Sequence, residues 1–150
     1  MLIRKFKSAD AAAVSDVIRQ TMRVTNSQDY SMQILAPLVE YFSPENVLLL
    51  SKERICLVAE IENRVVGTVA LEDSELCAFF VHPDFQRKGV GTNLIKAIED
   101  IAAKNKVEII KFASSLSAVS FYEKIGYRKN GSDREETAGK QIGMEKHLSQ

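Results

Sequence analysis

This sequence has no excess of charge of either sign and no long apolar run. Its 150 residues include 20 lysines and arginines and 20 aspartates and glutamates, so the formal net charge is zero. A protein whose main partner is nucleic acid usually carries a basic footprint. A membrane-spanning helix needs roughly 18 or more apolar residues in a row, and residues 1–7 lack the apolar segment of a secretory signal. We therefore expect no nucleic-acid partner and no membrane attachment.

Cysteine and histidine are scarce. The chain has two of each, Cys56, Cys77, His82 and His147. Both cysteines fall within predicted strands, where a buried free thiol is the ordinary finding. A metal site would need more ligands than two cysteines and two distant histidines supply. We therefore expect free thiols, no metal, and a cytoplasmic protein, because thiols stay reduced in that compartment.

Repeats, linkers and low-complexity segments are also missing from the sequence. Its hydrophobic fraction of 45% and charged fraction of 27% are those of an ordinary globular protein. A length of 150 residues is sufficient for one domain with a hydrophobic core. We expect residues 1–150 to form a single domain.

Apolar periodicity predicts strands and helices along the whole chain. In order, these are a strand at 2–6, helices at 8–24, 32–41 and 44–52, strands at 55–61, 65–71 and 75–82, a helix at 92–103, a strand at 107–113, a helix at 118–125, and strands at 127–129 and 141–148. A strand–helix–strand unit makes strands 75–82 and 107–113 parallel. The segment 130–140 is polar and glycine-bearing, which is typical of a mobile loop.

Individual residues add local signals to this pattern. Ser8 or Asp10 can cap the first helix, and Ser43, which precedes a proline, can cap the third. Pro37 should kink the second helix or mark its first turn. Gly67 indicates a bulge or a close backbone approach within its strand.

The central strand and the turn after it organise the rest of the chain. Residues 76–81 form an unbroken apolar run, which predicts a strand buried on both faces and ended by Pro83. The turn from Gln86 to Gly91 opens a helix, where free backbone N–H groups and the helix dipole bind phosphate. Glycine lets the backbone approach a ligand closely, and Arg87 and Lys88 add positive charge. The sequence therefore predicts an anion site at this turn.

Two common phosphate motifs do not match the turn. Residues 89–94 begin like the dinucleotide fingerprint, but Leu94 stands in place of the third glycine. The Gly-Lys-Ser/Thr of a nucleoside triphosphatase loop does not follow either. The pattern Gln-x-x-Gly-x-Gly over residues 86–91, after a strand that ends in Val-x-Pro, resembles the coenzyme A pyrophosphate loop of the GNAT superfamily of N-acetyltransferases.

A second stretch carries the same resemblance. Ala118 is followed four residues later by Tyr122 and then by Gly126-Tyr127, which is similar to the other GNAT signature. The order of predicted elements agrees over nearly the whole chain. The resemblance implies an α/β (α+β) fold. Its mixed, mostly antiparallel twisted sheet would have about seven strands with one splayed parallel pair, and four to five helices would flank it.

The resemblance implies acetyl-CoA as donor, bound along the central strand and the turn. The pantetheine arm would pair with the backbone of the central strand as a pseudo-strand, and the pyrophosphate would lie on amides of residues 86–92. Ser115 stands where the family often has an asparagine that contacts the cofactor. The implied cofactor-binding residues are Phe79, Phe80, Val81, Gln86, Arg87, Lys88, Gly89, Val90, Gly91, Thr92, Ser115 and Tyr122.

The resemblance also implies a catalytic role for Tyr122. As general acid, this phenol with an ordinary pKa near 10 would protonate the departing thiolate. The alternative is core packing, because Tyr122 lies on the apolar stripe of its helix. Glu72 and Glu75, at the entry of the central strand, are candidate general bases or else solvated turn carboxylates. His82 is predicted closer to the cofactor turn than to the acceptor.

The implied acceptor is an amine of a small molecule or a peptide, which attacks directly without a covalent enzyme intermediate. We expect its pocket between the first helices and the loops 25–31 and 130–140, where Tyr30, Glu40 and Tyr41 are the polar or aromatic candidates. A non-catalytic acyl-CoA sensor or interaction module on the same fold is the alternative function. The missing third glycine disfavours a dinucleotide-dependent oxidoreductase. Exposed edge strands would allow a homodimer.

Overall fold

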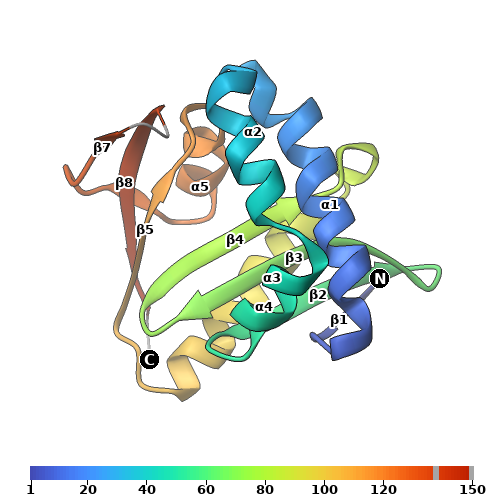
Figure 1. Ribbon diagram of the computed structural model, residues 1–150. Coiled ribbons are helices and arrows are strands. Elements are labelled where there is room, and N and C mark those ends of the chain that lie inside the picture. The colour runs from blue at the N-terminus through green and yellow to red at the C-terminus, as the bar shows by residue number, and fades with distance from the viewer. Residues whose placement is uncertain (137–138, 149–150) are drawn as a thin grey trace.

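A sheet of eight strands forms the middle of the molecule, with helices on both faces (Figure 1). The computed structural model describes residues 1–136 and 139–148. The strands are β1 (Leu2–Lys5), β2 (Ile55–Ile61), β3 (Arg64–Glu72), β4 (Glu75–Val81), β5 (Ile109–Ser114), β6 (Arg128–Lys129), β7 (Arg134–Glu136) and β8 (Gly139–His147). The α-helices are α1 (Ala11–Val24), α2 (Met32–Tyr41), α3 (Pro44–Ser51), α4 (Val90–Lys104) and α5 (Val119–Lys124). Four 3₁₀ turns are η1 (Ser8–Asp10), η2 (Asn26–Gln28), η3 (Pro83–Phe85) and η4 (Leu116–Ala118).

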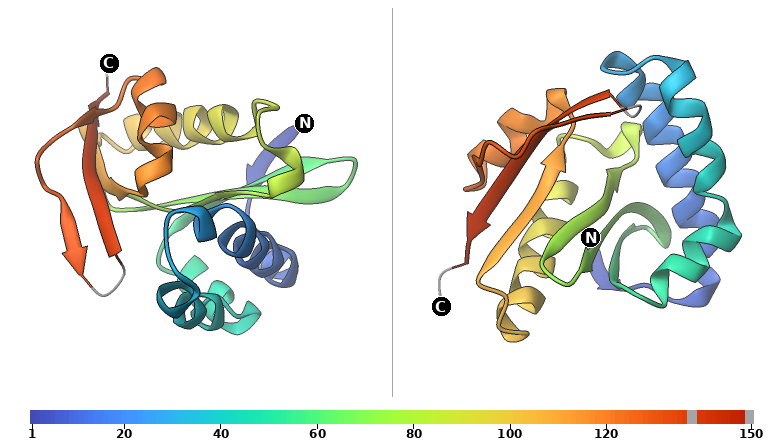
Figure 2. Two further views of the ribbon diagram at one scale, coloured as in Figure 1. Left: turned by 90° about the horizontal axis from the view of Figure 1, so that it is seen from above. Right: turned by 60° about the vertical axis from the view of Figure 1, so that its left-hand side comes forward.

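The topology of the sheet matches the expected fold class. Its strand order is β1-β2-β3-β4-β5-β8-β6, and β7 pairs with β8 beside this path. Among the described strands, the pairing of β4 with β5 is parallel and the others are antiparallel. Helices α4 and α5 lie on one face of the sheet, and α1, α2 and α3 lie on the other (Figure 2). The prediction of a mostly antiparallel sheet with one parallel pair is confirmed.

The parallel strands β4 and β5 touch at one end only. They share a single register pair, Glu75 with Lys111, and then separate toward the ends where the chain leaves each strand (Figure 1). Of the β4 side chains, Leu76 is buried, whereas residues 77–81 are partly exposed. The prediction of a central strand buried on both faces is therefore wrong, because β5 diverges and leaves an opening beside β4.

The main core lies between the sheet and α4. The apolar stripe of this helix is buried as the periodicity predicts, through Val90, Leu94, Ile95, Ile98 and Ala102. A Cβ atom added to Gly67 of β3 would lie 2.9 Å from Leu94 Cδ1 and 3.0 Å from Val90 Cγ1. The backbone of β3 at Gly67 therefore lies close to α4, which is one of the two roles predicted for this glycine. The helix begins at residue 90, two residues before the predicted start.

Other local predictions have mixed outcomes. Ser43 caps α3 as expected, because its Oγ accepts a hydrogen bond from the N–H of Asn46 at 3.2 Å. Pro37 lies inside α2 instead of in its first turn. The expected mobile loop at 130–140 contains β7 and the start of β8, which form an antiparallel pair. Residues 137–138 of this predicted loop lie outside the described residues.

The side chains of Ser8 and Asp10 do not cap α1. The buried Asp10 carboxylate accepts a hydrogen bond from the backbone N–H of Lys7 at 2.7 Å and pairs with Arg4 at 2.8 and 2.9 Å. Arg4 also bonds Glu60 of β2 at 2.6 Å. One guanidinium therefore joins β1, η1 and β2. Its hydrogen bonds hold the pKa of the Asp10 carboxyl below the usual value.

We predict that Asp10→Asn lowers the free energy of unfolding at pH 7 by about 1–3 kcal/mol, because Arg4 loses one of its two anionic partners. Since the folded pKa of Asp10 is lowered, its contribution is complete above the ordinary carboxyl pKa near 3.9. That contribution disappears as the pH falls through the lowered folded value. Urea denaturation at pH 7 and in this acid range should show a steeper loss for the wild type than for the variant.

Asp16→Asn is the matched control, because Asp16 is an exposed residue of the same helix region. Its substitution should leave both the stability at neutral pH and the acid dependence close to wild type. An equal acid loss in Asp10→Asn and the wild type would refute the role given to the Arg4–Asp10 pair.

Candidate active site

The turn before α4 presents free backbone N–H groups at its surface. Within the described residues, the amides of residues 86–89 have no hydrogen-bond partner in the chain, and the first-turn amides of α4 lack one by helix geometry. Gly89 precedes the helix with φ of +80°, and Arg87 has φ of +63°. These left-handed residues bend the turn so that it leads directly into α4. The turn is therefore suited to hold an anion, and the anion site stays a prediction.

One side chain of this turn is hydrogen-bonded to neighbouring segments, and two charged side chains are exposed. The Gln86 amide nitrogen donates to Thr25 Oγ1 at 3.0 Å and to the carbonyl of Val81 at 3.2 Å. The Lys88 ammonium lies 5.3 Å from the ring centre of Phe85, a cation–π distance. Both Lys88 and Arg87 remain exposed. Gln86 therefore fixes the turn with its side chain and offers an anion only its backbone, whereas the two cations are accessible.

The backbone of β4 presents two residues to the opening beside β5. The N–H of His82 donates across to β3 at 2.8 Å, and Phe80 pairs with Thr68 in the same register. Because successive peptide groups alternate sides along a strand, those of Phe80 also face β3. The Phe79 peptide groups and the N–H of Val81 face the opening, whereas the carbonyl of Val81 already accepts from the Gln86 amide nitrogen at 3.2 Å. Phe80 was also expected to pair with the pantetheine, and in this structure its peptide groups face β3 and not the opening.

A β-bulge in β4 redirects the side chains next to the opening. Ala78 has φ of +47°, and the register between β3 and β4 shifts beside it. Ala78 consequently lines a recess on the α3 side of the sheet, whereas Phe79 packs in the core on the α4 side. A bulge commonly re-aims side chains in this manner. It places the Phe79 ring against the residues that surround Tyr122.

Tyr122 lies in an aromatic cluster at the same place. Its ring centre is 4.5 Å from that of Phe112, 5.3 Å from Phe121, 5.7 Å from Tyr127 and 5.9 Å from Phe79. The residue is only 5% exposed. Burial raises the pKa of the Tyr122 hydroxyl well above its ordinary value near 10. The phenol therefore stays protonated at neutral pH.

The hydroxyl of Tyr122 is not needed for a hydrogen bond that stabilises the fold. In the described part of the chain it has no hydrogen-bond partner, and no side-chain polar atom there is fully buried without one. The hydroxyl therefore reaches space that a solvent molecule or a ligand can occupy. By contrast, the hydroxyl of Tyr127 donates to Glu99 at 2.8 Å. Tyr122 is both a core residue and a proton donor without a protein acceptor.

The candidate bases lie at the closed end of the β4–β5 pair. Arg54 Nε pairs with Glu72 at 3.1 Å, and Arg134 pairs with Glu75 at 3.2 Å. Both carboxylate side chains are nearly half exposed, at 44% and 45%. The cluster around Tyr122 lies further along β4, beyond the bulge. The structure therefore does not bring either carboxylate beside Tyr122.

His82 and Ser115 occupy loop positions at the open ends of the two strands. The buried His82 accepts a hydrogen bond at Nδ1 from the N–H of Asp84 at 3.1 Å, and its Nε2 lies 3.3 Å from Arg64 Nη2. His82 therefore caps η3 and supports the turn. Ser115 precedes η4 and is partly exposed, and its side chain makes no capping hydrogen bond.

The expected acceptor residues have different environments. Tyr30 is buried, and its hydroxyl donates to the carbonyl of Lys140 at 2.8 Å. Glu40 and Tyr41 are exposed on the outer part of α2. Tyr30 therefore connects the segment after α1 to β8 and does not line an open pocket.

Sequence reasoning missed two polar contacts near Tyr30. The Asp29 carboxylate accepts hydrogen bonds from the backbone N–H and the hydroxyl of Ser117, at 3.0 and 2.6 Å. Thr25 accepts the bond from Gln86 described above. The first pair is 88 residues apart and the second 61. No motif or periodicity in the sequence relates residues at such separations.

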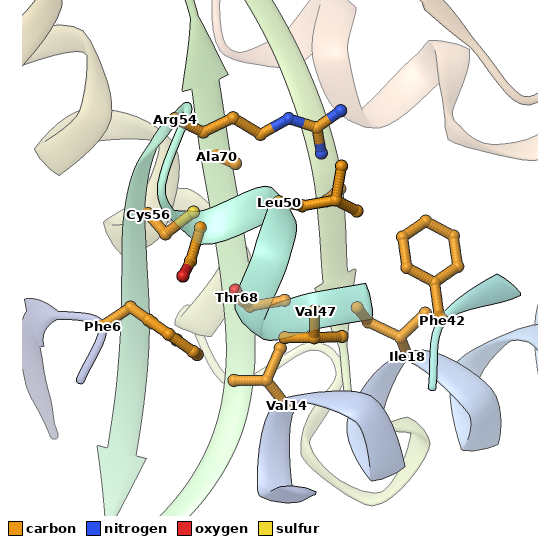
Figure 3. Close-up of a pocket in the computed structure, with 12 residues that line it drawn as sticks. Phe6, Val14, Ile18, Phe42, Val47, Leu50, Arg54, Cys56, Thr68 and Ala70 are labelled. Carbon is orange, nitrogen blue, oxygen red and sulfur yellow. The ribbon is translucent and has the colours of Figure 1, made fainter. Parts of the chain in front are cut away.

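A small recess lies beneath α3, between this helix and the sheet (Figure 3). In this view Arg54 lies at the top of the lining residues and Val14 at the bottom, with Phe6 and Phe42 to the left and right (Figure 3). Its lining residues are Phe6, Val14, Ile18, Phe42, Val47, Leu50, Ser51, Arg54, Cys56, Thr68, Ala70 and Ala78. A volume of about 30 Å³ suits one or two water molecules at most. The recess is too small for an acceptor molecule.

The cysteines of the chain are free and partly exposed. Cys56 and Cys77 both pair with Ala70, from either side of β3. Burial raises the pKa of the Cys77 thiol to about 11, so it is an unreactive neutral thiol. Across residues 1–136 and 139–148, no three His, Cys, Asp or Glu residues come together as metal ligands. No helix in those ranges combines the length and apolarity that crossing a bilayer requires.

The comparisons with known proteins agree with this geometry. The family model of the acetyltransferase (GNAT) domain matches residues 26–148. An uncharacterized N-acetyltransferase of Escherichia coli K12, YafP, is 26% identical over 137 residues, which cover 91% of this chain and 87% of YafP.

Two solved structures show the same fold. A GCN5-related N-acetyltransferase from Rhodopseudomonas palustris has a TM-score of 0.88 and 24% identity, with 98% of this chain and 95% of that chain covered. The PaiA N-acetyltransferase from Thermoplasma acidophilum, solved in complex with coenzyme A, has a TM-score of 0.84 and 22% identity, with 97% and 98% covered. The match to the family model over most of its length shows that this chain belongs to the GNAT acetyltransferase family.

Proposed function

We propose that this protein transfers an acetyl group from acetyl-CoA to an amine of a small molecule or peptide, by direct attack in a ternary complex. One observation carries the proposal: a protonated phenol, Tyr122, has an unpartnered hydroxyl beside the unpaired edge of β4. An acyltransferase needs a proton donor at the leaving group and backbone donors at the carbonyl. This site offers both groups at one opening.

The donor is proposed to lie along β4 and on the turn before α4. The Phe79 peptide groups and the N–H of Val81 face the opening, where they can pair with the amides of a pantetheine arm. The free amides of residues 86–92, with Arg87 and Lys88 beside them, suit the pyrophosphate. Ser115, at the end of β5, offers a hydroxyl from the other side of the opening.

The acyl transfer is proposed to proceed in one active site without a protein nucleophile. The amine nitrogen bonds to the thioester carbon, and a backbone N–H of β4 near the bulge stabilises the negative charge on the carbonyl oxygen. The carbon–sulfur bond then breaks, and the Tyr122 hydroxyl donates its proton to the sulfur. The proton released by the amine leaves through water, and the phenolate regains a proton from solvent.

Glu75 is proposed to take up the proton of the amine through water. It begins β4, its side chain is half exposed, and it lies where β4 still pairs with β5. Glu72 has a similar exposure and also pairs with an arginine, but it belongs to β3, and its partner Arg54 is more buried than Arg134. The two carboxylates therefore form a natural pair for comparison.

Tyr122→Phe should lower kcat by about 100-fold or more, because the leaving thiolate loses its proton donor. The affinity for acetyl-CoA should stay within about twofold, since the ring and its packing are preserved. Release of free thiol from acetyl-CoA measures the first quantity, and calorimetric titration measures the second. The control is Tyr127→Phe, which removes a hydroxyl from the same cluster and should leave kcat near wild type.

An unchanged kcat in Tyr122→Phe would remove the acid role. The substrates for this assay are a panel of polyamines, aminoglycosides, amino acids and peptide N-termini. Tight binding of acetyl-CoA by the wild type without thiol release from any of them would favour a non-catalytic acyl-CoA sensor instead.

Gly89→Ala should weaken acetyl-CoA binding about fivefold. A residue with a Cβ atom at φ of +80° is strained by about 1 kcal/mol, so the turn shifts and its amides lose alignment. Gly131→Ala is the control, because Gly131 has φ of +82° with nothing within 4 Å of an added Cβ. It introduces the same strain in a loop away from the turn. Equal affinities of the two variants, measured by calorimetry, would contradict the placement of the pyrophosphate.

Glu75→Gln should lower kcat/KM by at least about tenfold if Glu75 serves as the base. Glu72→Gln should change it by less than about twofold. Both substitutions remove a carboxylate of similar exposure from an arginine pair of similar length. A larger effect at Glu75 therefore reports the position of the carboxylate, because Glu72 has the more buried arginine partner. Steady-state kinetics at saturating acetyl-CoA provides the measurement, and equal effects would withdraw the assignment of Glu75.

A further inference from the structure

The segment between α1 and α2 is hydrogen-bonded to the turn that follows β4. Thr25 Oγ1 accepts from the Gln86 amide nitrogen at 3.0 Å, and this same nitrogen lies 3.2 Å from the carbonyl of Val81. Four residues earlier, the buried Thr21 hydroxyl donates to the carbonyl of Val17 at 2.7 Å and also lies 3.1 Å from the carbonyl of Val81. The end of α1 therefore holds both the last residue of β4 and the first residue of the anion-binding turn.

The same segment is also bonded to the chain that follows β5. Asp29 accepts two hydrogen bonds from Ser117 of η4, as described above. Beside it, the Tyr30 hydroxyl donates to the carbonyl of Lys140 in β8. Ser117 lies two residues before the start of α5, the helix that carries Tyr122. The second anchor therefore acts on the element that positions the proposed acid.

These two anchors lie on opposite sides of the opening between β4 and β5. The strands pair at Glu75 and Lys111 only, so no strand-to-strand bond sets their separation at the other end. Figure 1 shows the segment between α1 and α2 above that open end, between α5 and the turn that precedes α4. The aromatic cluster connects the two sides on the α4 face of the sheet. Residues 25–29 connect them on the other face.

We propose that residues 25–29 form a strap that sets the distance between the cofactor turn and Tyr122, with Thr25 and Asp29 as its positioning residues. The strap holds the opening at the width that lets one bound donor touch both the amides of the turn and the phenol of α5. The kinetic part of this inference rests on the proposed function, whereas the mechanical part does not.

The mechanical test is hydrogen exchange of the unliganded protein. Asp29→Ala removes the anchor to η4, and the strap model predicts about three- to tenfold faster exchange in the distant turn, residues 86–92. Thr25→Val removes the other anchor and should accelerate exchange in residues 115–124. Changes confined to the neighbourhood of each substitution would overturn the strap. Because no substrate is present, this result is independent of whether the proposed chemistry is right.

Ser27→Ala is the matched control within the strap. The Ser27 hydroxyl bonds only the carbonyls of Arg23 and Val24 at the end of α1, and it contacts neither side of the opening. This variant should leave exchange unchanged in both distant segments. Asp29→Asn keeps one acceptor for Ser117, so it provides a milder variant if Asp29→Ala proves poorly folded in a thermal melt. It should show the same distant change at reduced size.

The kinetic test is a double-mutant cycle with thiol release as the readout. Thr25→Val and Asp29→Ala should each lower kcat/KM by about three- to tenfold, and the double variant should lose little more, because either break releases the strap. Thr25→Ser should restore the wild-type value, since it keeps the hydroxyl. Additive losses would show two independent local contacts and would refute the strap. If neither substitution changes hydrogen exchange in the distant segment, the strap is refuted but the proposed function is not. If the wild type is inactive, the proposed function is refuted but the strap is not.

Discussion

The rest of the structure depends on the single register pair that joins the parallel strands β4 and β5. Glu75 pairs with Lys111, but the following residues of β4 and β5 do not pair. One edge of β4 therefore keeps unpaired peptide groups in the middle of the sheet. Unpaired backbone groups next to a core require a partner, and here the fold leaves them for a ligand. The turn before α4, the bulge in β4 and helix α5 with Tyr122 all lie around this interruption of the sheet.

Much of this arrangement could be predicted from the sequence because its signals are local. The stripe of α4, the hairpin of β2 and β3, and the Ser43 cap each depend on residues a few positions apart. The glycine-bearing turn at 86–91 is also a local pattern, and its position between a strand and a helix matches the structure. The aromatic packing of Tyr122, offered as the alternative to catalysis, is present together with a free hydroxyl.

The remaining features follow from contacts that sequence patterns do not record. An apolar run such as residues 76–81 has the same appearance whether a neighbouring strand covers it or diverges from it, so the exposure of β4 was missed. The bulge at Ala78 changes which side chains share a face, and nothing in the sequence marks it. Hydrogen bonds such as that between Asp29 and Ser117 depend on how distant segments come together. Likewise, β7 pairs with β8 although the composition of residues 130–140 is polar and predicts a loop.

The bulge at Ala78 has a consequence for how the protein can diversify. Beyond it, β4 offers mainly main-chain groups toward the opening, and these are the same for any amino acid that tolerates the strand. On the opposite face, α1 to α3 and the hairpin of β7 and β8 present side chains, which single substitutions alter. With donor and acceptor placed as proposed, recognition of the donor can persist when the sequence changes, while the residues around the acceptor vary. Such a division allows one scaffold to acquire new substrates without rebuilding the part that supplies the acetyl group.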